Sequence, residues 1–379
     1  GIQGLFDRLC VYSGPQWLGT KRLRFPATVS ELMKFSVQLS CDYPDPAYGG
    51  KQLYADMIEQ ALLADRLGFD AVSITEHHLI NLLMMPAPLQ FAVKIAGVTK
   101  RVKIILGVAV LPLHDMRVYA GELVCADIFT DYRLLVGLGR GAFPFETARM
   151  GIPIDKTLEK FDESVAVLQT LLTEEEVSWS GKYYQFEPLT VMPRPDREIP
   201  LLMSAVKPEA IYHSTRRGFH IMTTPLAGDH QYMLDQVDAF DRGKSELGPA
   251  GEALTLSLSR VSFLVKDDAD RRAKNAIAHH YYGRFDNIRG PGVMHHGVIS
   301  PLPRTVPIEE TAENLLVCTP SEMIDKLKVY EAVGVDRFIL NINFGTSQPE
   351  MLECIENFAT QVMPHFAAHN ASVPIRQVI

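Results

Sequence analysis

Residues 68–78 read Gly-Phe-Asp-Ala-Val-Ser-Ile-Thr-Glu-His-His, and this stretch indicates the class of fold. The glycine follows an amphipathic helix, which its left-handed conformation can end, and the short apolar run after it is typical of a buried strand. Glu76, His77 and His78 stand where that strand ends. In a barrel of alternating strands and helices, catalytic groups collect at the carboxyl ends of the strands. The stretch therefore predicts a parallel βα unit with titratable side chains at an active-site rim.

The same alternation of strands and helices continues on both sides of this stretch. Strands are predicted at 34–41, 70–74, 103–110, 132–138, 200–204, 219–223, 254–265 and 336–340. Helices are predicted near 51–67, 88–98, 116–129, 155–173, 208–217, 229–246, 267–281, 320–333 and 349–367. Eight strands, each with a helical partner, favour a closed (β/α)8 TIM barrel, an α/β fold, over an open doubly wound sheet.

Two segments interrupt the alternation. Residues 177–189 alternate at period two around a Ser-Gly pair, which predicts an inserted β-hairpin. Residues 283–316 contain glycines, prolines and paired histidines without a clear period, and a loop of that length in a compact domain is usually a lid or a binding loop. We expect a leader at 1–32, a single barrel domain over 33–369 and a tail at 370–379, because the Met-Lys pair that opens the domain is typical of a native start.

Composition and charge narrow the classes of function. The chain has 379 residues, a net charge of −8 and a sequence pI near 5.9. It therefore lacks the basic field that favours nucleic acid or an anionic membrane surface. Its five cysteines include no CxxC pair, so neither a disulfide framework nor a zinc site is indicated. The sequence has no apolar run of about 20 residues. We expect a cytoplasmic protein, without a metal, whose partners are small molecules or protein subunits.

Short motifs follow one another along most of the chain. They are Met33-Lys34-Phe35, Gly68-Phe69-Asp70 leading into Glu76-His77-His78, Leu111-Pro112 with Arg117, Val136-Gly137-Leu138-Gly139-Arg140-Gly141, Gly181-Lys182-Tyr183-Tyr184, Thr319-Pro320-Ser321-Glu322, Gly334-Val335-Asp336 and Met363-Pro364. In this order and spacing they resemble the bacterial luciferase-like flavin-dependent monooxygenases. The resemblance covers roughly residues 33–367 and implies the same barrel.

The resemblance also implies a reaction. Reduced FMN would be a loosely held co-substrate supplied by a separate flavin reductase, and its reaction with O2 at C4a would give the peroxyflavin that oxygenates a small organic substrate. The barrel would supply binding, electrostatics and exclusion of water. Dimers of the resembling family use the early helices, so we expect a homodimer built on helices within 51–67 and 88–129. Apolar residues near strand ends favour a mainly apolar substrate; they are Leu82, Leu83, Met84, Met85, Phe143 and Phe145.

Within this resemblance, His77 is the candidate general acid or base, because it matches the family position whose imidazole lies near the reactive edge of the flavin. An imidazole titrates near neutral pH and can exchange a proton with a peroxide or a substrate carbonyl. Glu76 is the second catalytic candidate, with a role in orienting the ring. His78 is either a second orienting group or a structural histidine.

The cofactor-binding residues that the resemblance implies begin with Gly139 and Arg140. Glycines let a backbone approach a ligand, and the Arg140 guanidinium could contact the flavin phosphate or the reduced ring. Gly107 and Val108 stand where the family often has a non-proline cis peptide beneath the flavin ring, and we expect one here.

The phosphate region of the resembling family falls on Ala205, Val206 and Lys207. Pro208 then suits the first turn of a helix whose free N–H groups can face an anion. The contact would come from the Lys207 ammonium or from backbone amides. Thr223 is a further cofactor-binding candidate, because its hydroxyl follows another predicted strand.

Three alternatives remain open. A deazaflavin (F420)-dependent oxidoreductase of the same superfamily would share the barrel and transfer hydride without O2. A metal-dependent hydrolase would use Glu76, His77, His78 and His114 as ligands. Adjacent histidines on an extended segment point to opposite faces, which argues against joint ligation. The third alternative is a non-catalytic flavin-binding protein on the same scaffold.

Overall fold

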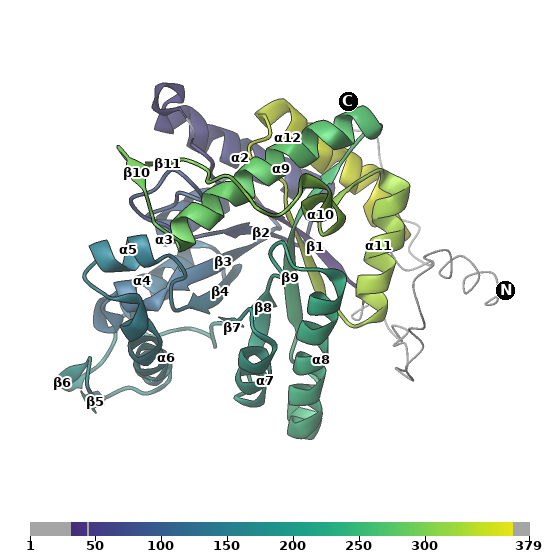
Figure 1. Ribbon diagram of the computed structural model, residues 1–379. Helices are drawn as coiled ribbons and strands as arrows, with labels where there is room; N and C mark the ends of the chain where they lie inside the picture. The colour runs from purple at the N-terminus through teal and green to yellow at the C-terminus, as the bar shows by residue number, and fades with distance from the viewer. Residues whose placement is uncertain (1–31, 44, 367–379) are drawn as a thin grey trace.

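The computed structural model describes residues 32–43 and 45–366, and Figure 1 shows this part of the chain as strands surrounded by helices. Almost all of the expected leader, residues 1–31, and the whole of the expected tail lie outside the described residues. Within the described part, no helix is long and apolar enough to cross a lipid bilayer.

Eight parallel strands form a closed barrel. They are β1 (Lys34–Gln38), β2 (Ala71–Ile74), β3 (Lys103–Val110), β4 (Leu134–Gly139), β7 (Leu201–Ser204), β8 (His220–Thr223), β9 (Leu256–Leu264) and β13 (Arg337–Asn341). The strands neighbour one another in this order, and pairing of β8 with β9 and of β13 with β1 closes the ring. The predicted (β/α)8 barrel is confirmed, because every predicted strand lies in the ring.

The long helices follow the strands around the outside of the barrel (Figure 1). They are α2 (Gly50–Leu67), α3 (Pro88–Ala96), α4 (Met116–Phe129), α6 (Thr157–Thr173), α7 (Pro208–Arg216), α8 (His230–Leu247), α9 (Asp268–Arg289), α11 (Pro320–Ala332) and α12 (Gln348–Asn357). Local sequence sets several ends. Gly68 has a φ of 88° and ends α2, while Thr319 and Glu322 form a capping box that begins α11.

The predicted hairpin is confirmed as β5 (Val177–Ser180) and β6 (Gln185–Leu189), which pair antiparallel. Glu163 of α6 fixes its turn, because its carboxylate accepts hydrogen bonds from the N–H groups of Lys182, Tyr183 and Tyr184.

The prediction of one irregular loop over 283–316 was wrong. Helix α9 continues to Arg289, and the segment then forms the hairpin of β10 (Met294–His295) and β11 (Val298–Ile299), helix α10 (Ile308–Glu313) and strand β12 (Leu316–Cys318). Strand β12 extends the sheet by pairing with the far end of β9. These elements, apart from α9, have six residues or fewer, which is too short for a hydrophobic period to show in the sequence.

The interior of the barrel combines apolar and polar residues. Its apolar cluster consists of Ala71, Ile105, Leu202, Met222 and Ile339. Register places small or polar residues beside members of this cluster: Ser73 beside Ile105, Gly137 beside Leu202, and Ser204 beside Met222. Gln38 in turn lies beside Ser73 and Asn341. The inner face therefore carries polar groups next to its apolar packing, and these groups can contact a polar ligand.

Candidate active site

The predicted site residues lie along one arc of the barrel. His77 follows β2, Gly107 and Val108 lie within β3, Arg140 follows β4, and Lys207 follows β7. These four strands are consecutive neighbours in the ring. The structure therefore brings residues that are up to 130 positions apart onto adjacent strand ends.

Glu76 is fully buried just after β2, and its carboxylate contacts two histidines. Its Oε1 lies 2.9 Å from Nε2 of His78 and 2.7 Å from Nε2 of His114, and its Oε2 accepts a hydrogen bond of 2.7 Å from the N–H of Val110. Burial alone would raise the pKa of Glu76, but these hydrogen bonds outweigh it and lower the pKa to about 2. The hydrogen bond to Glu76 raises the pKa of His78 in turn.

No hydrogen bond joins Glu76 to His77 among the described residues, so the structure gives no direct support for Glu76 orienting that ring. The carboxylate that His77 contacts is Glu146, which the sequence did not reveal. Nδ1 of His77 lies 3.1 Å from Oε2 of Glu146, and the other oxygen of Glu146 accepts a hydrogen bond from the N–H of His78. Glu146 is fully buried on the short helix α5 (Pro144–Arg149).

A phenylalanine stacks on one face of the His77 ring. Phe143 stacks on it with ring centroids 4.3 Å apart and an interplanar angle of 19°. Phe143 also meets Phe285 of α9 edge to face at 5.9 Å. The imidazole is therefore fixed both by a carboxylate and by an aromatic stack, and its side chain keeps 13% exposure.

The peptide bond between Gly107 and Val108 is cis, as expected from the resemblance. The pairing of β3 with β4 shifts by one residue here, between Leu106 and Ala109. The shift places Val108 over the glycines of β4, because a Cβ added at Gly139 would lie 2.3 Å from Cγ2 of Val108. Packing within the barrel therefore explains the glycine at position 139, because its missing side chain makes room for Val108.

The inner face at Gly107 has the features of a ligand cradle. Gly107 and Val108 are partly exposed, although the three residues directly before them in the strand are completely buried. A Cβ at position 107 would lie 2.5 Å from Cε of Met222 and 2.7 Å from Oγ of Ser73. The Ser73 hydroxyl is buried and has no hydrogen-bond partner among the described residues. A flat ring over Gly107 and Val108 fits this arrangement, since no side chain projects from position 107 and an unpaired hydroxyl lies beneath it.

Two cations stand at neighbouring strand ends beside this cradle. Arg140 is exposed, and its Nη1 lies 3.5 Å from the hydroxyl oxygen of Thr157 at the start of α6. Lys207 is exposed at the N-cap of α7 and makes no ion pair within the described part of the chain. Both cations, and the free N–H groups at the start of α7, are available to an anionic group such as a phosphate.

The remaining candidates differ in placement. Val206 is held by α8, because its carbonyl accepts hydrogen bonds from Gln236 at 2.7 Å and Tyr232 at 3.1 Å. Ala205 is buried. Thr223 is also buried, and it pairs in register with Leu258, which belongs to the core that faces the helices. Side chains in register share a face of a parallel sheet, so Thr223 points away from the barrel interior.

Helix α9 covers this side of the barrel (Figure 1). Arg284 of α9 forms a buried two-pronged ion pair with Asp42, with both N–O distances 2.7 Å. The hairpin after α9 is fixed by Asn81, whose side-chain oxygen accepts from Ile299 N–H at 3.0 Å and whose amide donates to Tyr43 at 3.1 Å. The predicted lid region is thus tied to the loops after β1 and β2.

The apolar residues expected to line the substrate are mostly part of the core. Leu82, Leu83, Met85 and Phe143 are buried, and Met84 and Phe145 are partly exposed. Of these six, Phe143 stacks on the His77 ring, and Met85 pairs with the His77 backbone. Within residues 32–43 and 45–366, no group of three or more His, Cys, Asp or Glu side chains is placed to hold a metal ion.

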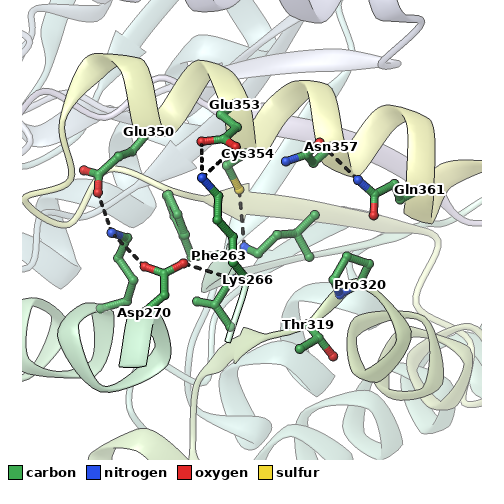
Figure 2. Close-up of a pocket in the computed structure, with 13 residues that line it drawn as sticks. Phe263, Lys266, Asp270, Thr319, Pro320, Glu350, Glu353, Cys354, Asn357 and Gln361 are labelled. Atoms are coloured by element: carbon green, nitrogen blue, oxygen red, sulfur yellow. Dashed lines mark hydrogen bonds and ion pairs between the residues drawn. The ribbon is translucent and has the colours of Figure 1, made fainter. Parts of the chain in front are cut away.

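A cavity of about 330 Å³ lies elsewhere, between the end of β9, the start of α9 and one side of α12 (Figure 2). Its charged groups are paired with one another: Lys266 pairs with Glu353 at 2.9 Å, and Lys274 pairs with Glu350 at 2.5 Å and Asp270 at 3.3 Å. None of the predicted site residues lines it. We therefore place the candidate active site at the arc of β2, β3, β4 and β7.

Comparison with known proteins gives an independent result. The chain is 28% identical over 352 residues to the oxygenase component of the flavin-dependent trigonelline monooxygenase of Acinetobacter baylyi, covering 88% of this chain and 96% of that protein. It is 26% identical over 334 residues to the F420-dependent glucose-6-phosphate dehydrogenase of Beutenbergia cavernae, covering 84% and 95%. The crystal structure of monooxygenase RslO1 from Streptomyces bottropensis has the same fold, with a TM-score of 0.75 at 24% identity, covering 88% and 100%.

Residues 33–337, most of the barrel, match the family described as luciferase-like monooxygenase. The chain therefore belongs to the luciferase-like monooxygenase family and is an oxidoreductase of that family.

Proposed function

We propose that this protein is the oxygenase component of a two-component flavin-dependent monooxygenase, which uses reduced FMN from a separate reductase, together with O2, to oxygenate a small, mainly apolar organic substrate. The observation that carries the proposal is the position of the fixed His77 imidazole on the strand next to the open Gly107–Val108 face. The similarity to the trigonelline monooxygenase component over 96% of its length supports the two-component arrangement.

The arrangement of the site supports a proposed position for each part of the cofactor. The Gly107–Val108 face and the unpaired Ser73 hydroxyl would support the ring. Arg140 and Lys207 would hold the phosphate, because they are the exposed cations at the neighbouring strand ends. When bound, the reduced flavin supplies the electrons that activate O2 for transfer of one oxygen atom.

The protein side of the reaction is proton transfer and exclusion of water. Glu146 accepts from Nδ1 of His77 if that nitrogen carries the proton, which leaves Nε2 as the basic nitrogen. Nε2 makes no hydrogen bond within the described residues and is free to take a proton from, or return one to, a reacting oxygen. Phe143, itself held by Phe285, covers one face of the imidazole and so limits its contact with water.

Anaerobic titration of the purified protein with reduced FMN, and in parallel with a reduced deazaflavin, tests the cofactor. We expect binding of reduced FMN that weakens by about tenfold in Arg140→Ala and in Lys207→Ala, since each removes one charged contact to the phosphate. Arg216→Ala is the matched control, because Arg216 is an exposed cation at the other end of α7. Tight binding of the deazaflavin alone would move the protein to the hydride-transfer class represented by the glucose-6-phosphate dehydrogenase relative.

Turnover separates an enzyme from a flavin-binding protein. With reduced FMN, O2 and a panel of apolar substrates, we expect an oxygenated product in wild type and a loss of about 100-fold or more in His77→Ala, the scale of a lost acid-base group. The matched comparison is His78→Gln, which changes the neighbouring imidazole but leaves His77 in contact with Glu146. Binding of FMN without any product from the whole panel would favour the non-catalytic alternative.

We also propose a homodimer formed through the early helices. Val118 and Phe129 of α4 are 60% and 65% exposed, and a groove of about 310 Å³ lies between α3 and α4. Apolar side chains of this size are favourable at an interface and costly in water. Light scattering should give twice the chain mass for wild type and a monomer for the Val118→Lys, Phe129→Lys double variant. A wild-type monomer would contradict this proposal.

A further inference from the structure

We propose that Glu146 is a positioning residue that selects the tautomer of His77. It thereby decides which ring nitrogen is the basic one and so what His77 presents to the active site. The inference rests on the proposed function for its catalytic meaning, but the tautomer itself is a property of the protein alone. Glu146 lies 69 positions from His77 in the sequence and reaches it from the start of a helix after a different strand.

The two oxygens of Glu146 have different partners. One accepts from the backbone N–H of His78, and the other lies 3.1 Å from Nδ1 of His77. An ionised carboxylate can accept at both oxygens but can donate at neither. The contact to His77 is therefore satisfied when Nδ1 carries the proton. In the neutral ring the lone pair then belongs to Nε2.

The setting makes this preference strong. Glu146 is completely buried, so no water competes for its oxygens, and the backbone N–H of His78 leaves one oxygen already occupied. The stacked Phe143 ring, 4.3 Å away, opposes a 180° turn of the imidazole, which would exchange Nδ1 with the carbon Cδ2 and so remove the contact to Glu146. Phe143 and Glu146 begin the same short segment after β4, so one element supplies both constraints.

Replacing Glu146 by glutamine should move the proton of the neutral His77 ring from Nδ1 to Nε2. The N–H of His78 still requires an acceptor, so the amide oxygen of Gln should face His78. The NH2 group must then face Nδ1 of His77, which can accept it only with a lone pair. The proton is thereby moved to Nε2, and the ring presents a donor to the site where the wild type presents an acceptor.

The first measurement is long-range 1H–15N correlation of the imidazole nitrogens in the cofactor-free protein, at a pH where the ring is neutral. His77 is assigned by its disappearance in His77→Gln. We expect a protonated Nδ1 in wild type and a protonated Nε2 in Glu146→Gln. A proton on Nε2 in wild type, or the same tautomer in both proteins, would overturn the proposal.

The second measurement is turnover. Glu146→Gln should lower kcat by about 100-fold while KM changes little, because the substrate contacts remain and the proton acceptor is lost. Glu163→Gln is the matched control: Glu163 also accepts several N–H groups, but in the β5–β6 hairpin, and should leave both the His77 tautomer and kcat unchanged.

These readouts separate two kinds of failure. If the tautomer switches but wild type oxygenates nothing, the positioning role stands and the proposed function fails. If kcat falls in Glu146→Gln while the tautomer stays fixed, the loss is structural and the positioning role is refuted. Circular dichroism and the unfolding midpoint of each variant show whether the fold is retained before either comparison is made.

Discussion

A single methyl group added at position 139 tests the packing on which the cofactor cradle rests. In Gly139→Ala the new Cβ would lie 2.3 Å from Cγ2 and 3.1 Å from Cβ of Val108. Favourable carbon contacts begin near 3.5 Å, so the overlap exceeds about 1 Å. Val108 cannot rotate away easily because a β-branched side chain is stiff at χ1. We expect a loss of about 1–3 kcal/mol in the free energy of unfolding, the range for overpacking.

A double-mutant cycle shows whether Val108 is the cause. Val108→Ala removes both methyl groups and should cost about 1 kcal/mol alone. In that background Gly139→Ala should cost less than it does in wild type, giving a coupling of about 1–2 kcal/mol. Gly121→Ala is the control: it lies in α4 with 3.7 Å to the nearest neighbouring atom and should stabilise the protein by about 0.5–1 kcal/mol.

The assay is equilibrium denaturant unfolding followed by circular dichroism, with equal m-values as the condition for comparing variants. If the costs of Gly139→Ala and Val108→Ala simply add within about 0.5 kcal/mol, the glycine is not there to accommodate Val108 and the steric account of this position is refuted.

Three further outcomes follow from the contacts around the site. The pKa of Glu76 is about 2 against an ordinary 4.5, so its ionised form contributes on the order of 3 kcal/mol to the free energy of unfolding above pH 4.5, and this contribution is lost as the pH falls towards 2. The free energy of unfolding of Glu76→Gln, measured between pH 2 and pH 5, should lack this part of the pH dependence. Arg284→Met leaves Asp42 buried without its partner and should lower the unfolding free energy by about 3–5 kcal/mol, part of which Asp42→Asn should restore in the double variant. Asn81→Ala removes the side-chain hydrogen bond to Ile299 of the lid, together with the one to Tyr43, and should speed hydrogen exchange at the Ile299 amide by about tenfold, with unchanged exchange arguing against the tie.

The barrel was predictable because its signals are local and repeated. Helix 116–129 was predicted at the bounds that α4 has, and the strands fall in the predicted order. Each signal needs only the period of apolar residues and a capping residue such as Gly68. The cis peptide at Gly107 was expected only from the resemblance, since no period or composition marks it.

The contacts that define the site were less predictable because they are tertiary. Nothing near His77 in the sequence indicates Glu146, and the adjacent Glu76 turned out to contact His78 and His114. Gly139 was expected to make room for a ligand, whereas the structure shows that it makes room for Val108 from the neighbouring strand. Such outcomes depend on which strands become neighbours, and an alternation pattern does not carry that information.

The two adjacent histidines have separate tasks, and this separation follows from strand geometry. Side chains at successive extended positions point to opposite sides, so His77 meets Glu146 from β4's end while His78 meets Glu76 beneath it. Because the pKa of His78 is raised by Glu76, its ion pair contributes stability below pH 6.5 that is lost as the pH rises through the raised value. His78→Gln should therefore lower stability mainly at low pH and keep turnover, whereas His77→Gln should abolish turnover and leave the unfolding free energy nearly unchanged. Unfolding and turnover measured on both variants between pH 5 and pH 9 would refute this division if either substitution produced both losses.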